Sequence, residues 1–352
     1  MSFQHSRSKH GFTTISRKFI APLLPLTLGV IASQAAADPV IYGRINVSLD
    51  QIDNQGAANI IAGSDAAIVD QWELNSNASR LGIKGEFALE NTGLTAIYLA
   101  EFETNADDGG SNPFSQRNIY IGVKGNFGQV IGGKFDTPLK VTEGKVDQFN
   151  DLRADIDVLV GGQNRVNNIV QYSTPKLADL FNVNLAFVTA EGTDVDLDGE
   201  PDDGLTDSIS ASLVADNGTF YGAIAYDSNQ LARRSLDGIV RGDILRAVAT
   251  AKLGQFELGA LLQQTKDVAP DSNAEDVSYL LSGGWLLGNY KLKAQYGLTK
   301  GDLSKEEGTL AALGLDYSLG KKTIVYTYVS SLKVDDVDAK DETFSVGLSH
   351  SF

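Results

Sequence analysis

The sequence predicts an all-β chain and, within that class, a transmembrane antiparallel β-barrel of sixteen strands. Three observations predict it. Apolar and polar side chains alternate over repeated stretches, short and long connections alternate between those stretches, and the chain begins with a segment typical of exported proteins. The stretches run over about ten residues, which crosses a bilayer as a tilted strand. Strands of soluble β-sandwiches are usually nearer ~5–6 residues.

Residues 1–37 have the pattern of a secretory signal peptide. An apolar stretch from Phe19 to about Ala32 is followed by three alanines at 35–37, which offer a cleavage site of small residues. The basic residues that precede the stretch are Arg7, Lys9, Arg17 and Lys18. A membrane-spanning helix is the alternative, but it needs ~20 apolar residues, and this stretch is shorter and holds two prolines. We therefore expect a mature chain of residues 38–352 that forms one barrel.

The composition of the mature chain excludes several classes of function. Residues 1–37 hold four of the 29 basic residues and none of the 45 acidic ones, so the mature chain has a formal net charge of −20. Such a chain lacks the basic surface that nucleic acid requires. The sequence contains no cysteine, so no disulfide stabilises this exported protein. With His350 as the only histidine after residue 37, we expect no catalytic Ser–His pair, no enzymatic activity and no cofactor.

The alternation itself is clearest in five stretches. In chain order they are 41–50, 79–89, 245–253, 290–298 and 344–352. In the first, Ile41, Ile45 and Leu49 share one parity, while Arg44 and Asp50 share the other. Successive strand residues point to opposite faces. Each stretch therefore has one apolar and one polar face, as expected of a strand between lipid and a wet lumen.

The connections complete the pattern. Short ones are expected near 90–92, 126–127, 175–180, 216–218, 254–255, 287–289 and 320–321, and long polar ones near 51–78, 104–114, 136–165, 190–206, 228–242, 266–275, 300–308 and 333–341. Seven short and eight long connections join sixteen strands, as in even-stranded barrels of the outer membrane. Both chain ends then lie at the short-connection end, and the last strand pairs with the first, which leaves no open edge in lipid. Only the third long connection is expected to hold a turn or two of helix.

The third long connection, residues 136–165, differs from the others because it combines apolar and acidic residues without a strand pattern. Its apolar residues are Leu139, Val141, Val146, Phe149, Leu152, Ile156, Val158, Leu159 and Val160, and its acidic residues are Asp147, Asp151, Asp155 and Asp157. So many apolar groups argue against disorder, and a long loop without regular structure is usually functional or disordered. We expect this loop to pack on the protein while it presents carboxylates to a wet space.

Several short motifs carry a resemblance to a known family. They are Tyr42-Gly43-Arg44, Ser79 to Glu86 (SRLGIKGE), Arg117 to Gly125 (RNIYIGVKG), Gly132 to Pro138 (GGKFDTP), Asn164 to Asn168 (NRVNN), Gln171 to Pro175 (QYSTP) and the terminal Phe352. In this order and spacing, they make the mature chain resemble Gram-negative general diffusion porins along its whole length. The resemblance implies a homotrimer of sixteen-stranded barrels in the outer membrane, with the third long loop folded into the lumen. It also implies passive diffusion of small hydrophilic solutes and ions, and contacts with the lipid bilayer, lipopolysaccharide and the barrel-assembly machinery.

The same resemblance implies a pore constriction in which acidic groups of the loop face a ladder of wall arginines. Carried over by motif, the ladder is Arg44, Arg80, Arg117 and Arg165 with Glu101 nearby, and the loop acids are Asp147, Asp151, Asp155 and Asp157. Arg117 fits the strand pattern less well, because it shares parity with the apolar Ile119 and Ile121. The alternatives are that the arginines are ordinary solvated charges and that some of the aspartates cap helical turns. The family's assembly machinery is expected to read Phe352.

One acidic run imitates the start of a calcium-binding loop. Asp194, Asp196 and Asp198 precede Gly199 at the spacing of an EF-hand loop, but Leu205 stands where the loop needs a bidentate glutamate. Weak binding of a divalent cation at the outer loops is the milder expectation. Two other functions remain alternatives to a general pore: a substrate-selective channel with a saturable solute site, and a structural or adhesive barrel.

Overall fold

The computed structural model describes residues 38–108, 112–194, 199–269, 271–335 and 339–352. The expected signal peptide, residues 1–37, lies outside the described residues, and so do Asp196 and Asp198. The strands within these ranges are β1 (Val40–Asn54), β2 (Val69–Ser76), β3 (Arg80–Ala88), β4 (Thr95–Thr104), β5 (Phe114–Gly125), β6 (Gly128–Asp136), β7 (Arg165–Ser173), β8 (Phe181–Val188), β9 (Ser208–Asp216), β10 (Phe220–Leu231), β11 (Arg241–Leu253), β12 (Phe256–Asp267), β13 (Glu275–Leu287), β14 (Tyr290–Gly301), β15 (Glu307–Ser318), β16 (Thr323–Val334) and β17 (Ala339–Ser351). The helices are α1 (Ala57–Ala62), α2 (Pro138–Val141) and the 3₁₀ turn η1 (Ile156–Val158). Among the described residues, no helix has both the length and the apolar character to cross a membrane.

The seventeen strands of the described ranges occupy sixteen positions in one closed antiparallel sheet. β1 pairs along one edge with β17 and along the other edge with β2 and then β3. β2 and β3 therefore follow each other along the same neighbour and count as one interrupted strand. Every other strand pairs with the strands before and after it in the sequence. The prediction of a sixteen-stranded antiparallel barrel is confirmed.

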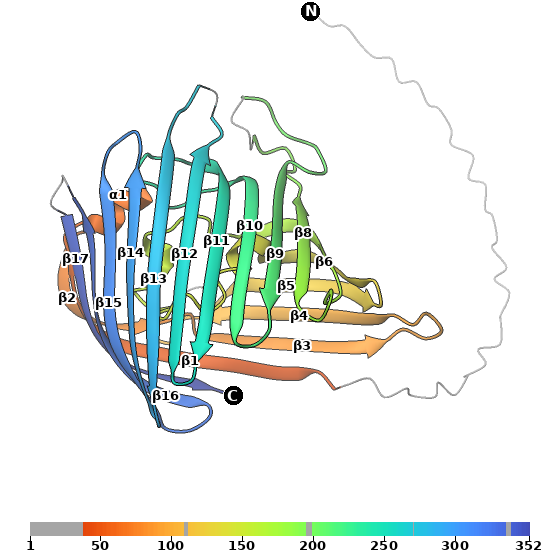
Figure 1. Ribbon diagram of the computed structural model, residues 1–352, viewed down its shortest axis with the longest axis horizontal. Helices are drawn as coiled ribbons and strands as arrows, with labels where there is room; N and C mark the ends of the chain where they lie inside the picture. Colours follow the sequence, from red (N-terminus) through yellow and green to blue (C-terminus); the bar gives the residue numbers. More distant parts are fainter. Residues whose placement is uncertain (1–37, 109–111, 195–198, 270, 336–338) are drawn as a thin grey trace, which may run out of the picture. The chain divides into compact units, whose positions relative to one another are not determined.

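The short connections lie close to their predicted positions. In Figure 1 the short connections between β9 and β16 follow the lower edge, and the one between β3 and β4 lies at the right. The longer connections lie at the opposite end (Figure 1). The predicted long connection 51–78 is wrong in part, because residues 51–54 belong to β1 and residues 69–76 form β2. These parts of β1 and β2 pair with each other. Their sequences are mostly polar, so the apolar alternation did not indicate strands. The prediction also missed α1, whose N-terminus is held by a residue from the far end of the chain. Both carboxylate oxygens of Asp341 accept hydrogen bonds from backbone N–H groups of residues 55–58.

The strands of the sheet, here called the wall, expose apolar side chains on one face and bury polar side chains on the other, which is the reverse of a water-soluble protein. Leu262 and Leu281 are 49% and 64% exposed, whereas the neighbouring Gln263 is 1% exposed. Aromatic side chains gather on the exposed face near the short connections, where Phe256 stacks on Trp285 at 5.9 Å. An outward apolar face with aromatic residues at its borders is the surface of a strand barrel in lipid.

Residues 137–164, the segment between β6 and β7 (here called the L3 segment), pack on the other face of the wall. Phe149 contacts Tyr328 of β16 edge to face at 5.7 Å, and Leu159 lies over Gly297 of β14 and Gly308 of β15. The apolar L3 residues with at most 1% exposure include Leu139, Val146, Phe149, Ala154, Ile156, Leu159 and Val160. Val141 is the exception at 61% exposed. The apolar groups of the segment thus find a dry surface on the wall, as the hydrophobic effect requires.

Candidate functional site

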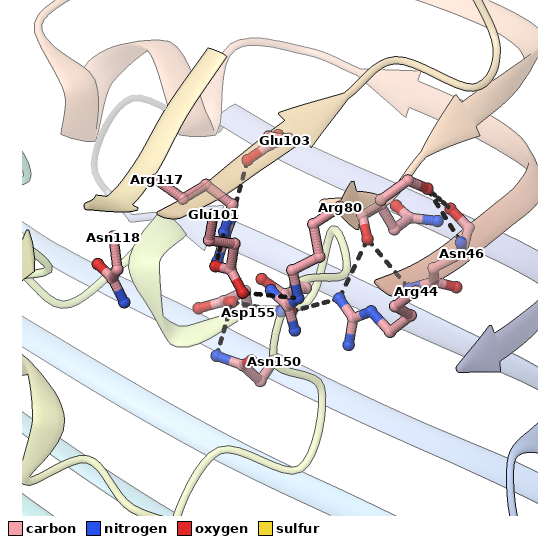
Figure 2. Close-up of polar contacts among 12 residues, drawn as sticks. Arg44, Asn46, Arg80, Glu101, Glu103, Arg117, Asn118, Asn150 and Asp155 are labelled. Atoms are coloured by element: carbon pink, nitrogen blue, oxygen red, sulfur yellow. Dashed lines mark hydrogen bonds and ion pairs between the residues drawn. The ribbon is translucent and has the colours of Figure 1, made fainter. Parts of the chain in front are cut away.

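Two arginines from the neighbouring strands β1 and β3 meet one carboxylate of the L3 segment. Arg44 (β1) and Arg80 (β3) reach Oδ2 of Asp151 at 2.5 Å and 3.4 Å. Figure 2 shows Arg44, Arg80 and Arg117 in a row along the wall, with Asn150 and Asp155 of the segment facing them. A carboxylate and guanidinium groups at these distances attract each other strongly, because each group is only partly exposed to water.

Arg117 extends the row through two glutamates. Its Nε donates to Glu101 at 2.8 Å and its Nη1 donates to Glu103 at 2.7 Å. Glu101 also accepts a hydrogen bond from the hydroxyl of Tyr42 at 2.8 Å. Positive and negative groups therefore alternate along β1 to β5 rather than forming a ladder of one sign.

A β-bulge accounts for the parity problem at Arg117. Ala100 pairs with Ile119, but Phe102 pairs with Gln116, so two residues of β5 face the single Glu101. The extra residue changes the parity of everything before it on the strand. Arg117 therefore shares the wall face of Arg80 although its sequence parity matches that of Ile119.

The break between β2 and β3 positions Arg44. Residues 77–79 interrupt the strand, and Ala78 among them has the unusual backbone angle φ of +48°. The break turns the carbonyl of Asn77 toward the lumenal face, where it accepts a hydrogen bond from Nη2 of Arg44 at 3.2 Å. The hydroxyl of Ser79 and the side chain of Asn46 close the gap in the ladder with hydrogen bonds. This guanidinium is therefore held by the wall as well as by Asp151.

Arg165 belongs to a second, adjoining cluster. Its Nη2 lies 3.0 Å from Oδ1 of Asp136, and its Nε donates to Asn118 at 2.9 Å. The Nζ of Lys140 lies 3.4 Å from the same Asp136 oxygen. No contact between Arg165 and an acid of the L3 segment appears among the contacts of the described residues.

The four predicted loop acids have different partners. Asp147 accepts hydrogen bonds from the backbone N–H groups of Phe149 and Ile156, at 2.7 Å and 3.1 Å. Asp155 accepts from the N–H groups of Asp151 and Asp157, and it is the N-cap of η1. These two carboxylates hold the backbone of the segment, which is the capping alternative raised by the sequence. Asp151 is the predicted acid that contacts the arginine row.

Sequence reasoning missed Glu143, a buried acid of the same segment. Its Oε1 accepts a hydrogen bond from Asn150, which in turn faces Asp155. Burial, reinforced by the nearby Asp147 carboxylate, raises the pKa of Glu143 to about 8. Burial also raises the pKa of Asp147 to about 6. No periodicity marks Glu143 in the sequence, because its environment is created by residues of other strands.

Sequence reasoning also missed two arginines, Arg246 and Arg153, that fix the L3 segment to the wall. Arg246 of β11 is fully buried, and its guanidinium donates to the carbonyl oxygens of Leu139 and Gly161, near the two ends of the segment. Arg153, in the segment itself, pairs with Asp50 and Glu73 of β1 and β2. Neither the strand alternation around Arg246 nor the irregular sequence around Arg153 indicated these roles.

Three hollows adjoin one another beside the arginine row and the L3 segment, each sharing lining residues with the next. An inner hollow of about 610 Å³ reaches the chain end at Phe352, and a middle hollow of about 370 Å³ adjoins it. Both are lined by Arg117, Glu143, Asp151 and Arg165. An outer hollow of about 730 Å³ lies among the long connections and shares Asp157 and Gln163 with the middle one.

The calcium-like run is described only in part. Asp194 accepts a hydrogen bond from the N–H of Gly199 at 2.9 Å, while Asp196 and Asp198 lie outside the described residues. Within the ranges that the structure covers, no group of three or more acidic, histidine or cysteine side chains could hold a metal ion. Weak cation binding by this run therefore stays a prediction.

The C-terminal residue closes the barrel seam. The backbone of Phe352 exchanges two hydrogen bonds with Gly43 of β1, at 3.0 Å and 3.3 Å. Its ring lies over Gly43 so closely that a Cβ added there would come within 2.3 Å of the ring. The same Cβ would lie 2.8 Å from the backbone carbonyl oxygen of Arg80, so glycine at 43 allows both the ring and the neighbouring strand to approach.

Comparisons with known proteins agree with this architecture. Two curated relatives are each 25% identical to this chain: the major outer membrane protein P.IB of Neisseria sicca, with 94% of this chain and 99% of the relative covered, and the outer membrane porin protein 32 of Delftia acidovorans, with 88% and 89% covered. Among solved structures, the anion-selective porin from Comamonas acidovorans superposes with a TM-score of 0.72 at 22% identity, over 89% of this chain and 99% of that one. This structural likeness shows the shared fold.

A family model described as Gram-negative porin matches residues 26–337, which is most of the chain. Members of that family are channels of the outer membrane and not enzymes. This chain belongs to the Gram-negative porin family and is a β-barrel protein of the outer membrane.

Proposed function

We propose that this protein is a passive, water-filled channel for small hydrophilic solutes and ions, narrowed by the L3 segment. The observation that carries the proposal is the contact of Asp151 with Arg44 and Arg80 at the junction of the inner and middle hollows. Opposed charges across a narrow pore create a transverse field, which screens solutes by charge and dipole.

The position of the L3 segment supports this narrowing. The sheet is closed, its apolar residues are exposed on one face, and the segment packs on the opposite face. In a closed barrel that opposite face is the lumen. Constriction residues on this proposal are Arg44, Arg80, Glu101, Arg117 and Asp151, with Arg165 and Glu143 beside them, while Asp147 and Asp155 keep the segment in shape.

Single-channel recording of the refolded full chain in planar bilayers tests the proposal. We expect discrete conductance steps that grow in proportion to potassium chloride concentration, because diffusion through water does not saturate. A matched preparation that was heat-denatured before addition should give no steps. A folded protein without conductance would instead support a structural or adhesive barrel.

Assembly is part of the proposal. Homotrimers are typical of the family, and we propose the same state here, reached through the barrel-assembly machinery and surrounded by lipid and lipopolysaccharide. Chemical cross-linking in native membranes should then give a ladder that ends at three chains.

A further inference from the structure

The outer hollow combines an apolar wall with a pair of arginines. Its apolar lining comes from α1 and from the connection between β10 and β11, residues 232–240, and includes Ile60, Ile61, Leu236, Ile239 and Val240. Its cationic lining is Arg233 and Arg234 of the same connection. The volume of about 730 Å³ lies within the usual range of ~300–1,000 Å³ for small-molecule sites, which are mostly apolar with a few placed polar groups.

Hydrogen bonds fix the walls of this hollow before any ligand arrives. The backbone N–H of Ser235 donates to Ile61 of α1 at 3.0 Å, and that of Gly162 donates to Ala232 at 3.0 Å. These two bonds join the three segments that line the hollow. A site whose walls are already ordered loses less entropy when it binds a ligand.

The two arginines keep hydrogen-bonding capacity for a ligand. Arg233 uses its Nε to bind the side chain of Asn164 at 2.7 Å, and none of the hydrogen bonds or ion pairs among the described residues involves its Nη atoms. Arg234 donates to the backbone carbonyl oxygens of Asp157 and Arg233 and not to a carboxylate. Among the described residues that line the hollow, Asp157 is the acid, so two cations face one anion there.

A buried amide adds a polar contact at the passage to the middle hollow. Gln163 lines both hollows, and in the described part of the structure neither its amide oxygen nor its amide nitrogen has a hydrogen-bond partner. A buried polar group without a partner costs free energy, which a bound polar ligand would recover.

We propose that the outer hollow binds an organic monoanion with an apolar body, such as an aromatic or branched aliphatic carboxylate. The proposal rests on the channel function above, for which it names a class of solute. The planar fork of Arg233 fits a carboxylate, and the isoleucines and Val240 cover the apolar body. Gln163 offers the next hydrogen bonds on the way toward the arginine row.

The test uses 4-fluorobenzoate and fluorine NMR on the refolded full chain in detergent. We expect saturable binding, and much weaker binding of fluoroacetate, which lacks the apolar body, and of 4-fluorobenzyl alcohol, which lacks the charge. Arg233→Gln should weaken 4-fluorobenzoate binding about tenfold, as the loss of one charged hydrogen bond predicts. Lys305→Gln removes the same charge from an exposed position on another long connection and should leave the affinity unchanged.

Val240→Ser tests whether the apolar wall contributes to binding. Leu303→Ser is its control, since both side chains are exposed but, of the two, Val240 lines the hollow. If Arg233→Gln fails to fold, Arg234→Gln replaces it. Non-saturable binding, equal binding of the alcohol, or equal affinities of the Arg233 and Lys305 variants would each overturn the proposal. Because binding is measured without current, conductance without binding rejects only this site, and binding without conductance rejects only the channel.

Discussion

At the residue scale, Asp151 joins the L3 segment to two strands of the wall. It has a left-handed backbone with φ of +64°, which asparagine tolerates well. Asp151→Asn should therefore keep the backbone while it removes the charge that faces Arg44 and Arg80. We expect the reversal potential in a potassium chloride gradient to shift toward anion preference.

Asp302→Asn is the control for this change, because Asp302 is an exposed acid of a long connection that pairs with Lys305. It should shift the reversal potential much less. Equal shifts in the two variants would mean that overall charge, and not the contact with the arginines, sets the selectivity. The structure favours this single substitution over a triple one, since Asp155 caps backbone N–H groups and its loss would disturb the segment.

The buried acids of the L3 segment predict a dependence of stability on pH. Burial raises the pKa of Glu143 to about 8 and that of Asp147 to about 6. A carboxyl group with a raised pKa binds more protons in the folded state, so stability is highest at low pH and is lost as the pH rises through the folded pKa. We expect the temperature at which the heat-modifiable form converts to fall between about pH 4, where these groups ordinarily titrate, and about pH 8.

Glu143→Gln stays neutral and should flatten this pH dependence, with a change on the order of a few degrees. Glu342→Gln, an exposed acid of β17, serves as the control and should leave the dependence intact. An unchanged profile in the Glu143 variant would contradict the assignment.

At the element scale, Arg246 holds the L3 segment in place from β11. Its guanidinium bonds to Gln263 of the wall and to carbonyl oxygens near both ends of the segment. Arg246→Met roughly keeps the volume but removes these bonds. The carbonyl oxygens of Leu139 and Gly161 keep Thr142 and Gln263 as donors, whereas the buried side-chain oxygen of Gln263 loses its donor, at a cost of about 1–3 kcal/mol. We expect larger and noisier single-channel currents, because a loosened segment blocks the lumen less.

Lys252→Gln removes a positive charge from the same strand at an exposed position and should leave the current amplitude nearly unchanged. If Arg246→Met shows the wild-type current and noise, the segment is held by its apolar contacts alone.

The seam between β17 and β1 is the second element with a testable role. Phe352 makes two backbone hydrogen bonds to Gly43 and covers it with its ring. Deletion of Phe352 should reduce the amount of assembled trimer in cells, while export and cleavage of residues 1–37 continue. Phe352→Tyr keeps the ring and should assemble normally, and trimer yields that do not differ between the two variants would count against a role in assembly. Heat-modifiable migration of membrane extracts measures the yield.

At the scale of the whole molecule, the question is the sign of ion selectivity. The charged groups that line the inner and middle hollows nearly balance. Among the described residues, the six basic ones are Arg44, Arg80, Arg117, Lys140, Arg153 and Arg165, and the seven acidic ones are Glu101, Glu103, Asp136, Glu143, Asp151, Asp155 and Asp157, of which Glu143, with a pKa of about 8, is mostly neutral at pH 7. The formal charge of −20 for residues 38–352 is not balanced. Acidic mouths concentrate cations over about one Debye length, ~10 Å at 0.1 M salt.

We therefore expect a mild cation preference at low salt that weakens as salt rises. The related structure from Comamonas acidovorans is described as anion-selective. On our prediction, the two proteins would therefore have reversal potentials of opposite sign at low salt. Reversal potentials across a tenfold potassium chloride gradient, taken at low and at high mean concentration, decide the matter. Anion preference at low salt would show that the arginine row dominates over the acidic outer charge.

Local periodicity in the sequence was sufficient to predict most of the strands, the short connections, the membrane-barrel class and the unusual segment 136–165, but not β2. Alternation is a property of neighbouring residues, so it can be recognised without knowing which strands pair. The parity of Arg44 and Arg80 followed from it directly. The apolar content of the segment likewise required a packing surface, and all its large apolar groups except Val141 are at least partly buried.

Only the tertiary structure decided which charges meet. The bulge opposite Glu101 turned Arg117 to the wall face, and the break at Asn77 aimed a carbonyl at Arg44. Asp151 and Arg44 are 107 residues apart in the sequence, and Asp341 caps a helix 283 residues away. Such contacts depend on the register of strand pairs and on which wall residues the L3 segment packs against. The sequence supplied the residues, but closure of the sheet brought them within bonding distance.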